Sequence, residues 1–107
     1  MLAMELPAVI THHRDAIATL CRQAHARRLD LFGSGVRADF DAQRSDFDFL
    51  VAFEDLPPTS YADAFFTLKS GLERLLNRPI DLVVDRAIRN PYFRQQVEAE
   101  RQPVYVS

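Results

Sequence analysis

Cysteine and long apolar runs are scarce in this sequence. Cys21 is the only cysteine among 107 residues, which excludes a disulfide framework and a cysteine-based zinc site. No apolar run approaches the roughly 20 residues that a membrane-spanning helix needs. The first residues, MLAMELPAVITHHRD, lack the order of basic and then apolar residues that marks a signal peptide. We therefore expect a cytoplasmic protein that does not contact a membrane.

Two common nucleotide-binding patterns are also absent. Neither Gly-x-x-x-x-Gly-Lys-Ser/Thr nor Gly-x-Gly-x-x-Gly occurs, so the chain has no P-loop and no Rossmann fingerprint. The formal net charge is −2 at pH 7, which argues against a surface that binds a long nucleic-acid backbone directly. A nucleotide that binds through a metal ion remains compatible with this charge.

The composition and the apolar spacing indicate one globular domain, residues 1–107. Hydrophobic residues make up 48% of the chain and charged residues 26%, which is typical of a globular protein. Helical and alternating apolar periods predict three helices and four strands. The helices are expected from Pro7 to about Arg27, from Pro58 to near Asn77, and from Asn90 to about Glu100. The strands are expected at RLDLFG (28–33), SDFDFLVAFE (45–54), PIDLVVD (79–85) and QPVYVS (102–107).

This order of elements predicts an α+β fold, in the form of an α/β sandwich of two layers. A small mixed β-sheet would carry the helices on one face, because each amphipathic helix must bury its apolar stripe against the sheet.

The predicted strand at 45–54 contains two acidic residues that point the same way. Side chains alternate along a strand, so Asp46, Asp48 and Leu50 share one face. The two aspartates are ionised at neutral pH, because an unperturbed Asp has a pKa of about 3.9. Their Cα atoms would lie about 6.5 Å apart. A divalent cation such as Mg²⁺, which binds carboxylates together with phosphates, would relieve their repulsion.

A third carboxylate, Asp81, stands on the next predicted strand. If that strand pairs with the one before it, Asp81 joins Asp46 and Asp48 at one end of the sheet. Three carboxylates and two metal ions about 3.5–4 Å apart suit an in-line displacement at phosphorus. Asp46 and Asp48 would hold both ions, and Asp81 would complete one coordination shell and accept the proton of the nucleophile.

The dipeptide Gly33-Ser34 closes the strand at 28–33 and suits phosphate binding. A residue without Cβ lets phosphate oxygens approach the backbone, and successive N–H groups can form an anion-binding nest. Ser34 would add a hydroxyl group, and Arg37 would add a fork of donors to the same phosphates. Alone, a Gly-Ser is most often a turn, and an Asp pair on a strand is most often an exposed edge. Their conjunction with Asp81 favours catalysis or metal-nucleotide binding.

The same residues resemble a known family. GSGVRADFDAQRSDFDFLV resembles the signature of the DNA polymerase beta nucleotidyltransferase superfamily, and IDLVV resembles the strand with its third carboxylate. The resemblance extends from Leu29 to about Asp85. Because of Arg37 and the short chain, the sequence is most similar to the minimal nucleotidyltransferase (MNT) branch, the antitoxin halves of HEPN/MNT toxin–antitoxin pairs.

The resemblance implies a palm-like fold and a role for each matching residue. Gly33, Ser34 and Arg37 would bind the triphosphate of ATP. Asp46 and Asp48 would bind two Mg²⁺ ions, with Asp81 as the third carboxylate. The sequence departs from the family at Ala38, where many members have Gly, and at Gly35, directly after Ser34.

Three functions follow from this resemblance and stay open at the level of sequence. The first is transfer of AMP from ATP to a hydroxyl group, typically a tyrosine of a cognate HEPN RNase toxin, by an antitoxin that forms a hetero-oligomer with it. The second is a non-catalytic antitoxin that neutralises the toxin by binding. The third is nucleotidyl transfer to a small molecule such as an aminoglycoside, which is disfavoured because such enzymes carry an additional domain for the acceptor.

Overall fold

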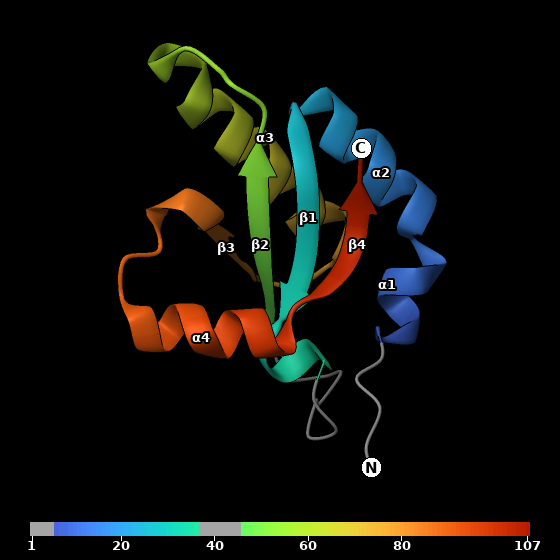
Figure 1. The fold of residues 1–107 in the computed structure, drawn as a ribbon. Helices are drawn as coiled ribbons and strands as arrows, with labels where there is room; N and C mark the ends of the chain where they lie inside the picture. Colours follow the sequence, from blue (N-terminus) through green and yellow to red (C-terminus); the bar gives the residue numbers. More distant parts are fainter. Residues whose placement is uncertain (1–5, 37–45) are drawn as a thin grey trace.

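The computed structural model describes residues 6–36 and 46–107 (Figure 1). Its helices are α1 (Ala8–His12), α2 (Arg14–Gln23), α3 (Pro58–Leu76) and α4 (Pro91–Glu100). Its strands are β1 (Ala26–Phe32), β2 (Phe47–Phe53), β3 (Ile80–Val84) and β4 (Gln102–Val106). Two short 3-10 segments, η1 (Gly33–Val36) and η2 (Asp85–Ala87), follow β1 and β3. Within the described ranges, no helix is both long and apolar enough to cross a membrane.

The first predicted helix, from Pro7 to about Arg27, is in fact two helices that meet at His13. The backbone of His13 leaves helical geometry, with φ −103° and ψ 16°, and its ring Nδ1 lies 2.8 Å from the carbonyl oxygen of Val9. In a continuous helix that carbonyl would accept from the His13 N–H, so the ring replaces the backbone donor. Helix α2 also ends earlier than predicted, at Gln23, because His25 adopts a left-handed φ of 58° and turns the chain into β1.

The four strands form one mixed sheet in the order β3-β2-β1-β4. Strand β1 pairs antiparallel with both β2 and β4, whereas β2 and β3 are parallel. Parallel neighbours need a crossover connection, and α3 provides it. The predicted α+β fold with a small mixed sheet is therefore confirmed.

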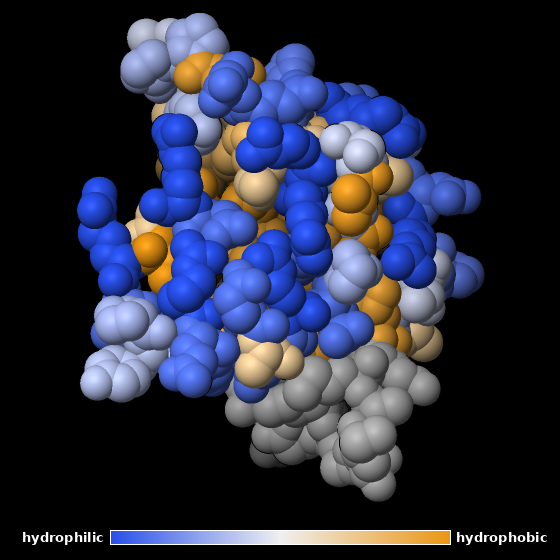
Figure 2. Space-filling view, viewed as in Figure 1, coloured by the Kyte–Doolittle hydropathy of each residue, from blue (hydrophilic) through white to orange (hydrophobic). Residues whose placement is uncertain are grey.

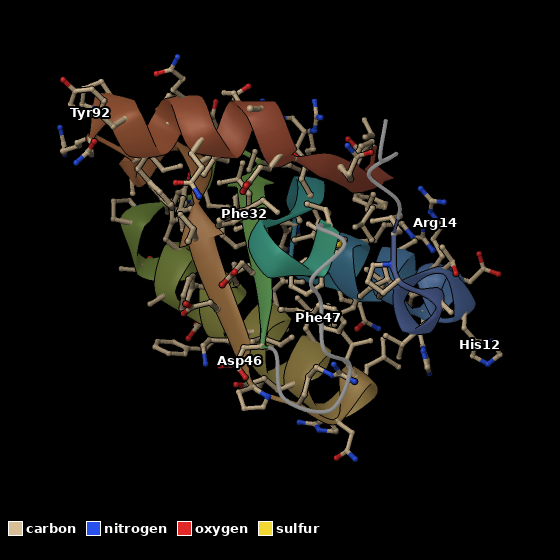
Figure 3. The ribbon with its side chains drawn as sticks, turned by 90° about the horizontal axis from the view of Figure 1, so that it is seen from below. His12, Arg14, Phe32, Asp46, Phe47 and Tyr92 are labelled. Carbon is tan, nitrogen blue, oxygen red and sulfur yellow. The ribbon has the colours of Figure 1, made fainter. Side chains whose placement is uncertain are left out.

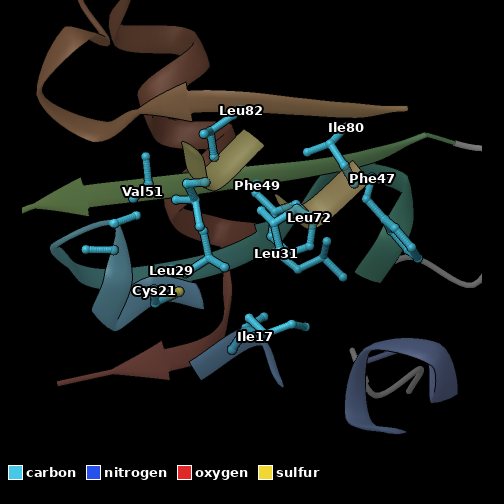
Figure 4. Packing of buried hydrophobic residues seen from close by; sticks show 14 of the residues in the cluster. Ile17, Cys21, Leu29, Leu31, Phe47, Phe49, Val51, Leu72, Ile80 and Leu82 are labelled. Atoms are coloured by element: carbon cyan, nitrogen blue, oxygen red, sulfur yellow. The ribbon is translucent and has the colours of Figure 1, made fainter. Parts of the chain in front are cut away.

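One face of the sheet carries the main hydrophobic core, under α2 and α3 (Figure 4). Alternate residues of β1 and β2 point into this core, as the period of a strand requires. The helices contribute apolar residues at helical spacing. Fully buried members of the cluster include Ile17, Cys21, Leu29, Leu31, Phe47, Phe49, Val51, Leu68 and Leu72.

The opposite face is crossed by α4, so the predicted placement of the helices on one face holds for α1, α2 and α3 but not for α4. Figure 3 shows α4 on one side of the sheet and the other helices on the other side. Phe32 and Leu50, which alternate away from the main core, form a second cluster with the fully buried Val97 of α4. These apolar residues need cover, and α4 supplies it. Figure 2 shows this face, where apolar side chains lie between hydrophilic ones.

A buried ion network holds the end of α4 to the central strand. The side chain of Asp30 in β1 is fully buried, and it accepts hydrogen bonds from Arg101 Nε at 2.9 Å and from Arg28 Nε at 3.0 Å. Arg101 also donates to Glu98 at 2.7 Å. Burial lowers the pKa of Arg101, but hydrogen bonds and charges from Asp30 and Glu98 outweigh it and raise the pKa overall. Arg101 therefore stays charged, and its hydrogen bonds to Asp30 join α4, β4 and β1.

We expect the variant Asp30→Asn to lose on the order of 3 kcal/mol of unfolding free energy, since removing one charge of a buried pair leaves the other poorly compensated. Urea unfolding measures this loss. The control is Asp63→Asn, at an exposed position of α3, which should change stability by less than about 0.5 kcal/mol. Equal stabilities of the two variants would mean that the network contributes nothing to folding.

The thiol of Cys21 should be unreactive in the folded protein. The residue is fully buried in the main core, and this burial raises the pKa of the thiol to about 12. The folded chain therefore keeps its proton at pH 8, and no thiolate is available. A chromogenic disulfide reagent should react with it only after denaturation. Stability should fall between pH 9 and pH 12, because the unfolded chain releases the proton that the folded chain retains.

Candidate active site

Two of the candidate carboxylates stand side by side on the sheet. Asp48 in β2 and Asp81 in β3 are register partners across the parallel pair, which confirms the predicted neighbourhood of the two strands. Paired residues of adjacent strands project from the same face. Asp81 is exposed and Asp48 is half-buried, so both can be reached from solvent. They lie on the face that α4 crosses, because Leu50, two residues after Asp48, packs in the cluster of Val97.

Asp46 lies directly before β2 and is exposed (Figure 3). The sequence predicts that Asp46 belongs to the strand, but the strand begins one residue later, at Phe47. The structure thus brings Asp46 to the same end of the sheet as Asp48, outside the regular ladder. Coordination of a metal ion by Asp46 stays a prediction.

The carboxylate of Asp48 lies where a side chain on Gly33 would be. Because β1 and β2 are antiparallel, Phe32 is the register partner of Asp48, and Gly33 follows at the end of β1. Gly33 has φ 72°, and a Cβ built on it would lie 2.5 Å from Oδ2 of Asp48. Any other residue here would be strained in its backbone and would displace the carboxylate. The predicted conjunction of the Gly-Ser turn with Asp48 is therefore present.

Of the predicted phosphate-binding residues, the structure describes Ser34 in part and Arg37 not at all. The backbone of Ser34 belongs to η1, whereas its side chain lies outside what the structure describes. Arg37 lies wholly outside the described residues, as does Ala38. The proposed contacts of Ser34 and Arg37 with phosphate stay predictions.

Glu100, which sequence reasoning missed, also contacts the Gly-Ser turn. Its Oε1 accepts a hydrogen bond from the N–H of Gly33 at 3.2 Å. Glu100 is the last residue of α4, 67 positions from Gly33 in the chain. No local motif marks it, because the contact depends on how α4 crosses the sheet.

A second missed residue, Glu73, fixes the start of β3. Its Oε2 accepts from the N–H of Ile80 at 3.4 Å and from Lys69 Nζ at 3.1 Å. The hydrogen bond from Lys69, together with that from Ile80, lowers the pKa of Glu73. Ile80 directly precedes Asp81, so the ionised Glu73 helps to hold Asp81 in register with Asp48.

An arginine lies next to the start of β2. The guanidinium of Arg78 stacks over the ring of Phe47, with its central carbon 4.6 Å from the ring centroid. Phe47 lies between Asp46 and Asp48 in the chain, but its side chain points into the main core, on the face of the sheet opposite to Asp48. The sequence offered no signal for Arg78 beyond its position before β3.

The donors at this end of the sheet suit a hard divalent cation, since carboxylate oxygens are the ligands that Mg²⁺ prefers. The missing Cβ of Gly33 makes room for the carboxylate of Asp48 itself, which fills the place that a side chain would take. Among the residues that the structure describes, no group of three or more His, Cys, Asp or Glu side chains is gathered closely enough to hold a metal. The joint metal site of Asp46, Asp48 and Asp81 therefore stays a prediction.

The opposite end of the strands carries a cavity of about 270 Å³. Its lining includes Phe53 at the end of β2, Val84 at the end of β3, and Arg86, whose guanidinium stacks on Tyr61. None of the candidate acids lines it, so this cavity is separate from the candidate site.

Comparison with known proteins identifies the family. The sequence model of the family described as "Nucleotidyltransferase domain" matches residues 14–104 of this chain. Two proteins of Methanocaldococcus jannaschii, named "Putative protein adenylyltransferase MJ0128" and "Putative protein adenylyltransferase MJ1379", are 36% and 30% identical to this chain. Each similarity extends over 96 residues and covers 90% of this chain and 91% of the relative.

Solved structures agree with this assignment. One named "putative minimal nucleotidyltransferase" is 36% identical, with a TM-score of 0.68, and the match covers 88% of this chain and 91% of that one. The MNT antitoxin in complex with the tri-AMPylated HEPN toxin of Shewanella oneidensis is 23% identical, with a TM-score of 0.61, covering 92% and 73%. At that identity the likeness concerns the fold. The fold, the order of Gly-Ser and carboxylates, and these relatives agree, and the chain belongs to the nucleotidyltransferase domain family as a nucleotidyltransferase enzyme.

Proposed function

We propose that this enzyme is a magnesium-dependent protein adenylyltransferase that transfers AMP from ATP to a HEPN toxin and so acts as its antitoxin. The observation that carries this proposal is the register pairing of Asp48 with Asp81 beside the Cβ-free Gly33. Acids on adjacent strands, next to a Gly-Ser turn, suit nucleotidyl transfer.

The comparisons support the substrate class. The curated relatives are named protein adenylyltransferases. One structural neighbour is an MNT antitoxin with a tri-AMPylated HEPN toxin, and another is a toxin–antitoxin crystal structure with AMP-PNP, an ATP analogue. We extend to this chain a toxin partner, ATP as the nucleotide and a hetero-oligomer of the two proteins. ATP supply and an RNase target would both place the reaction in the cytoplasm.

The proposed chemistry gives each residue a task. An acceptor hydroxyl oxygen, which we propose to be that of a tyrosine, attacks the α-phosphorus of ATP, and the bond to pyrophosphate breaks. Asp81 takes the hydroxyl proton. Asp46, Asp48 and Asp81 would together hold two Mg²⁺ ions. When bound, these ions would neutralise charge on the phosphate oxygens. Gly33, Ser34 and Arg37 would bind and orient the triphosphate.

We further propose that residues 1–107 act as one minimal nucleotidyltransferase domain and that the toxin presents the acceptor. The helices and strands that the structure describes form one sheet and the helices that cover it. An acceptor group carried by a partner protein would then reach the exposed Asp81 from solvent.

The test is the intact mass of a HEPN toxin encoded beside this gene, after incubation with this protein, ATP and Mg²⁺. We expect a mass increase by whole AMP units. Asp48→Asn and Asp46→Asn should each lower the transfer rate by at least about 100-fold, on the scale of losing an electrostatic group of the transition state. Asp63→Asn, an exposed charge-matched control on α3, should keep full activity.

Two outcomes would contradict the proposal. Full activity of both Asp46→Asn and Asp48→Asn would show that these residues hold no essential metal. An unmodified toxin in a stable complex with this protein would mean that the antitoxin acts by contact alone.

Gly33→Ala should abolish most of the activity because its Cβ would lie 2.5 Å from Oδ2 of Asp48. The left-handed backbone at φ 72° should also cost about 1–2 kcal/mol of unfolding free energy. The control is Asn77→Ala, at the exposed left-handed residue after α3 with φ 55°. It should lower stability but leave AMP transfer unchanged, and an equal loss of transfer in both variants would rule out a direct role for Gly33.

A further inference from the structure

Two carboxylates from distant elements flank Gly33. Oδ2 of Asp48, from β2, lies on the Cα side, where a Cβ would meet it at 2.5 Å. Oε1 of Glu100, from the end of α4, accepts the Gly33 N–H at 3.2 Å. The first of these residues belongs to the candidate acids, whereas the second lies on an element to which the proposed chemistry assigns no task.

The main chain around Glu100 is fixed on both sides. Three residues before it, Val97 is fully buried against Phe32 and Leu50. Directly after it, Arg101 donates to the fully buried Asp30. The end of α4 therefore stands at a defined place relative to β1, and Glu100 can act as a fixed acceptor at the end of that strand.

Gly33 is a residue that needs such an acceptor. Glycine populates left-handed and right-handed backbone states with similar ease, so the sequence alone leaves the turn after β1 undetermined. A hydrogen bond from its N–H to a fixed carboxylate selects one orientation of the peptide. The turn Gly33–Val36 continues from that peptide, so its direction depends on this bond.

We propose that Glu100 is a positioning residue, which orients the Gly33–Val36 turn for the phosphates of the nucleotide through the Gly33 N–H. This inference rests on the proposed function. It also changes the part played by Gly33: its N–H is committed to Glu100, so the glycine serves through its missing Cβ, and the phosphate donors are the groups that follow it in the turn.

The experiment is a calorimetric titration of the 107-residue protein with ATP in the presence of Mg²⁺, followed by AMP-transfer kinetics. Glu100→Ala removes the acceptor, and we expect the Kd and the KM for ATP to rise on the order of tenfold, as for loss of one hydrogen bond to a charged group. The kcat at saturating ATP should fall much less. Glu100→Gln keeps an acceptor oxygen without the charge and should stay within about twofold of the wild type.

A control variant and a folding measurement separate positioning from general stability. Gln96→Ala, at an exposed position of the same helix, should leave the Kd unchanged. Thermal unfolding of Glu100→Ala and Glu100→Gln should coincide within a few degrees, so that a difference in Kd between them reports the hydrogen bond.

Each other outcome overturns the inference. An unchanged Kd in Glu100→Ala would show that the contact has no effect on the turn. Tighter binding would mean that the carboxylate competes with phosphate for the Gly33 N–H, and equal weakening in Glu100→Gln would assign the effect to charge. If the wild type binds no ATP, the proposed function itself fails. If the wild type binds ATP and Glu100→Ala binds it equally well, only this inference fails and the proposed function stands.

Discussion

The buried pair of Asp30 and Arg101 is the contact on which the arrangement of this molecule depends. Asp30 lies on β1, the strand that pairs with both β2 and β4, and its carboxylate is out of contact with solvent. A buried carboxylate requires donors; Arg28 supplies one from the same strand, and Arg101 supplies another from the junction of α4 and β4. The interaction therefore determines where the last helix ends, and with it the position of Glu100 beside the turn after β1.

The second constraint is the connection through α3. A helix of 19 residues carries the chain from the end of β2 to the start of β3 and makes these strands parallel. Their first residues therefore stand at the same end of the sheet, and the antiparallel β1 brings Gly33 there as well. Asp48, Asp81 and the Gly-Ser turn come together from three strands, although 48 positions separate Gly33 from Asp81 in the sequence.

The sequence predicted the elements well and the long-range contacts poorly. Alternation and turn residues identified β2, α3 and β3 to within two residues at each end, because local periods and Pro or Gly boundaries determine them. The break at His13 depends on one side-chain hydrogen bond and was missed. The crossing of α4 over the second face was also missed, because the outward alternation of Phe32 and Leu50 could be read only once the strand order was known. For the same reason Glu100 and Glu73 carried no signal, whereas Asp48 and Asp81 did.

The direction of α3 has an electrostatic consequence for the candidate site. Its carboxyl end, Leu76, lies a few residues before β3, so the helix directs the negative end of its dipole toward the end of the sheet that holds Asp81. Many phosphate sites use the opposite, positive end of a helix. Here the helix field adds to that of the carboxylates, so this end of the sheet favours a cation and disfavours a bare anion. If the site takes the metal and the nucleotide that we propose, each ligand would raise the affinity for the other.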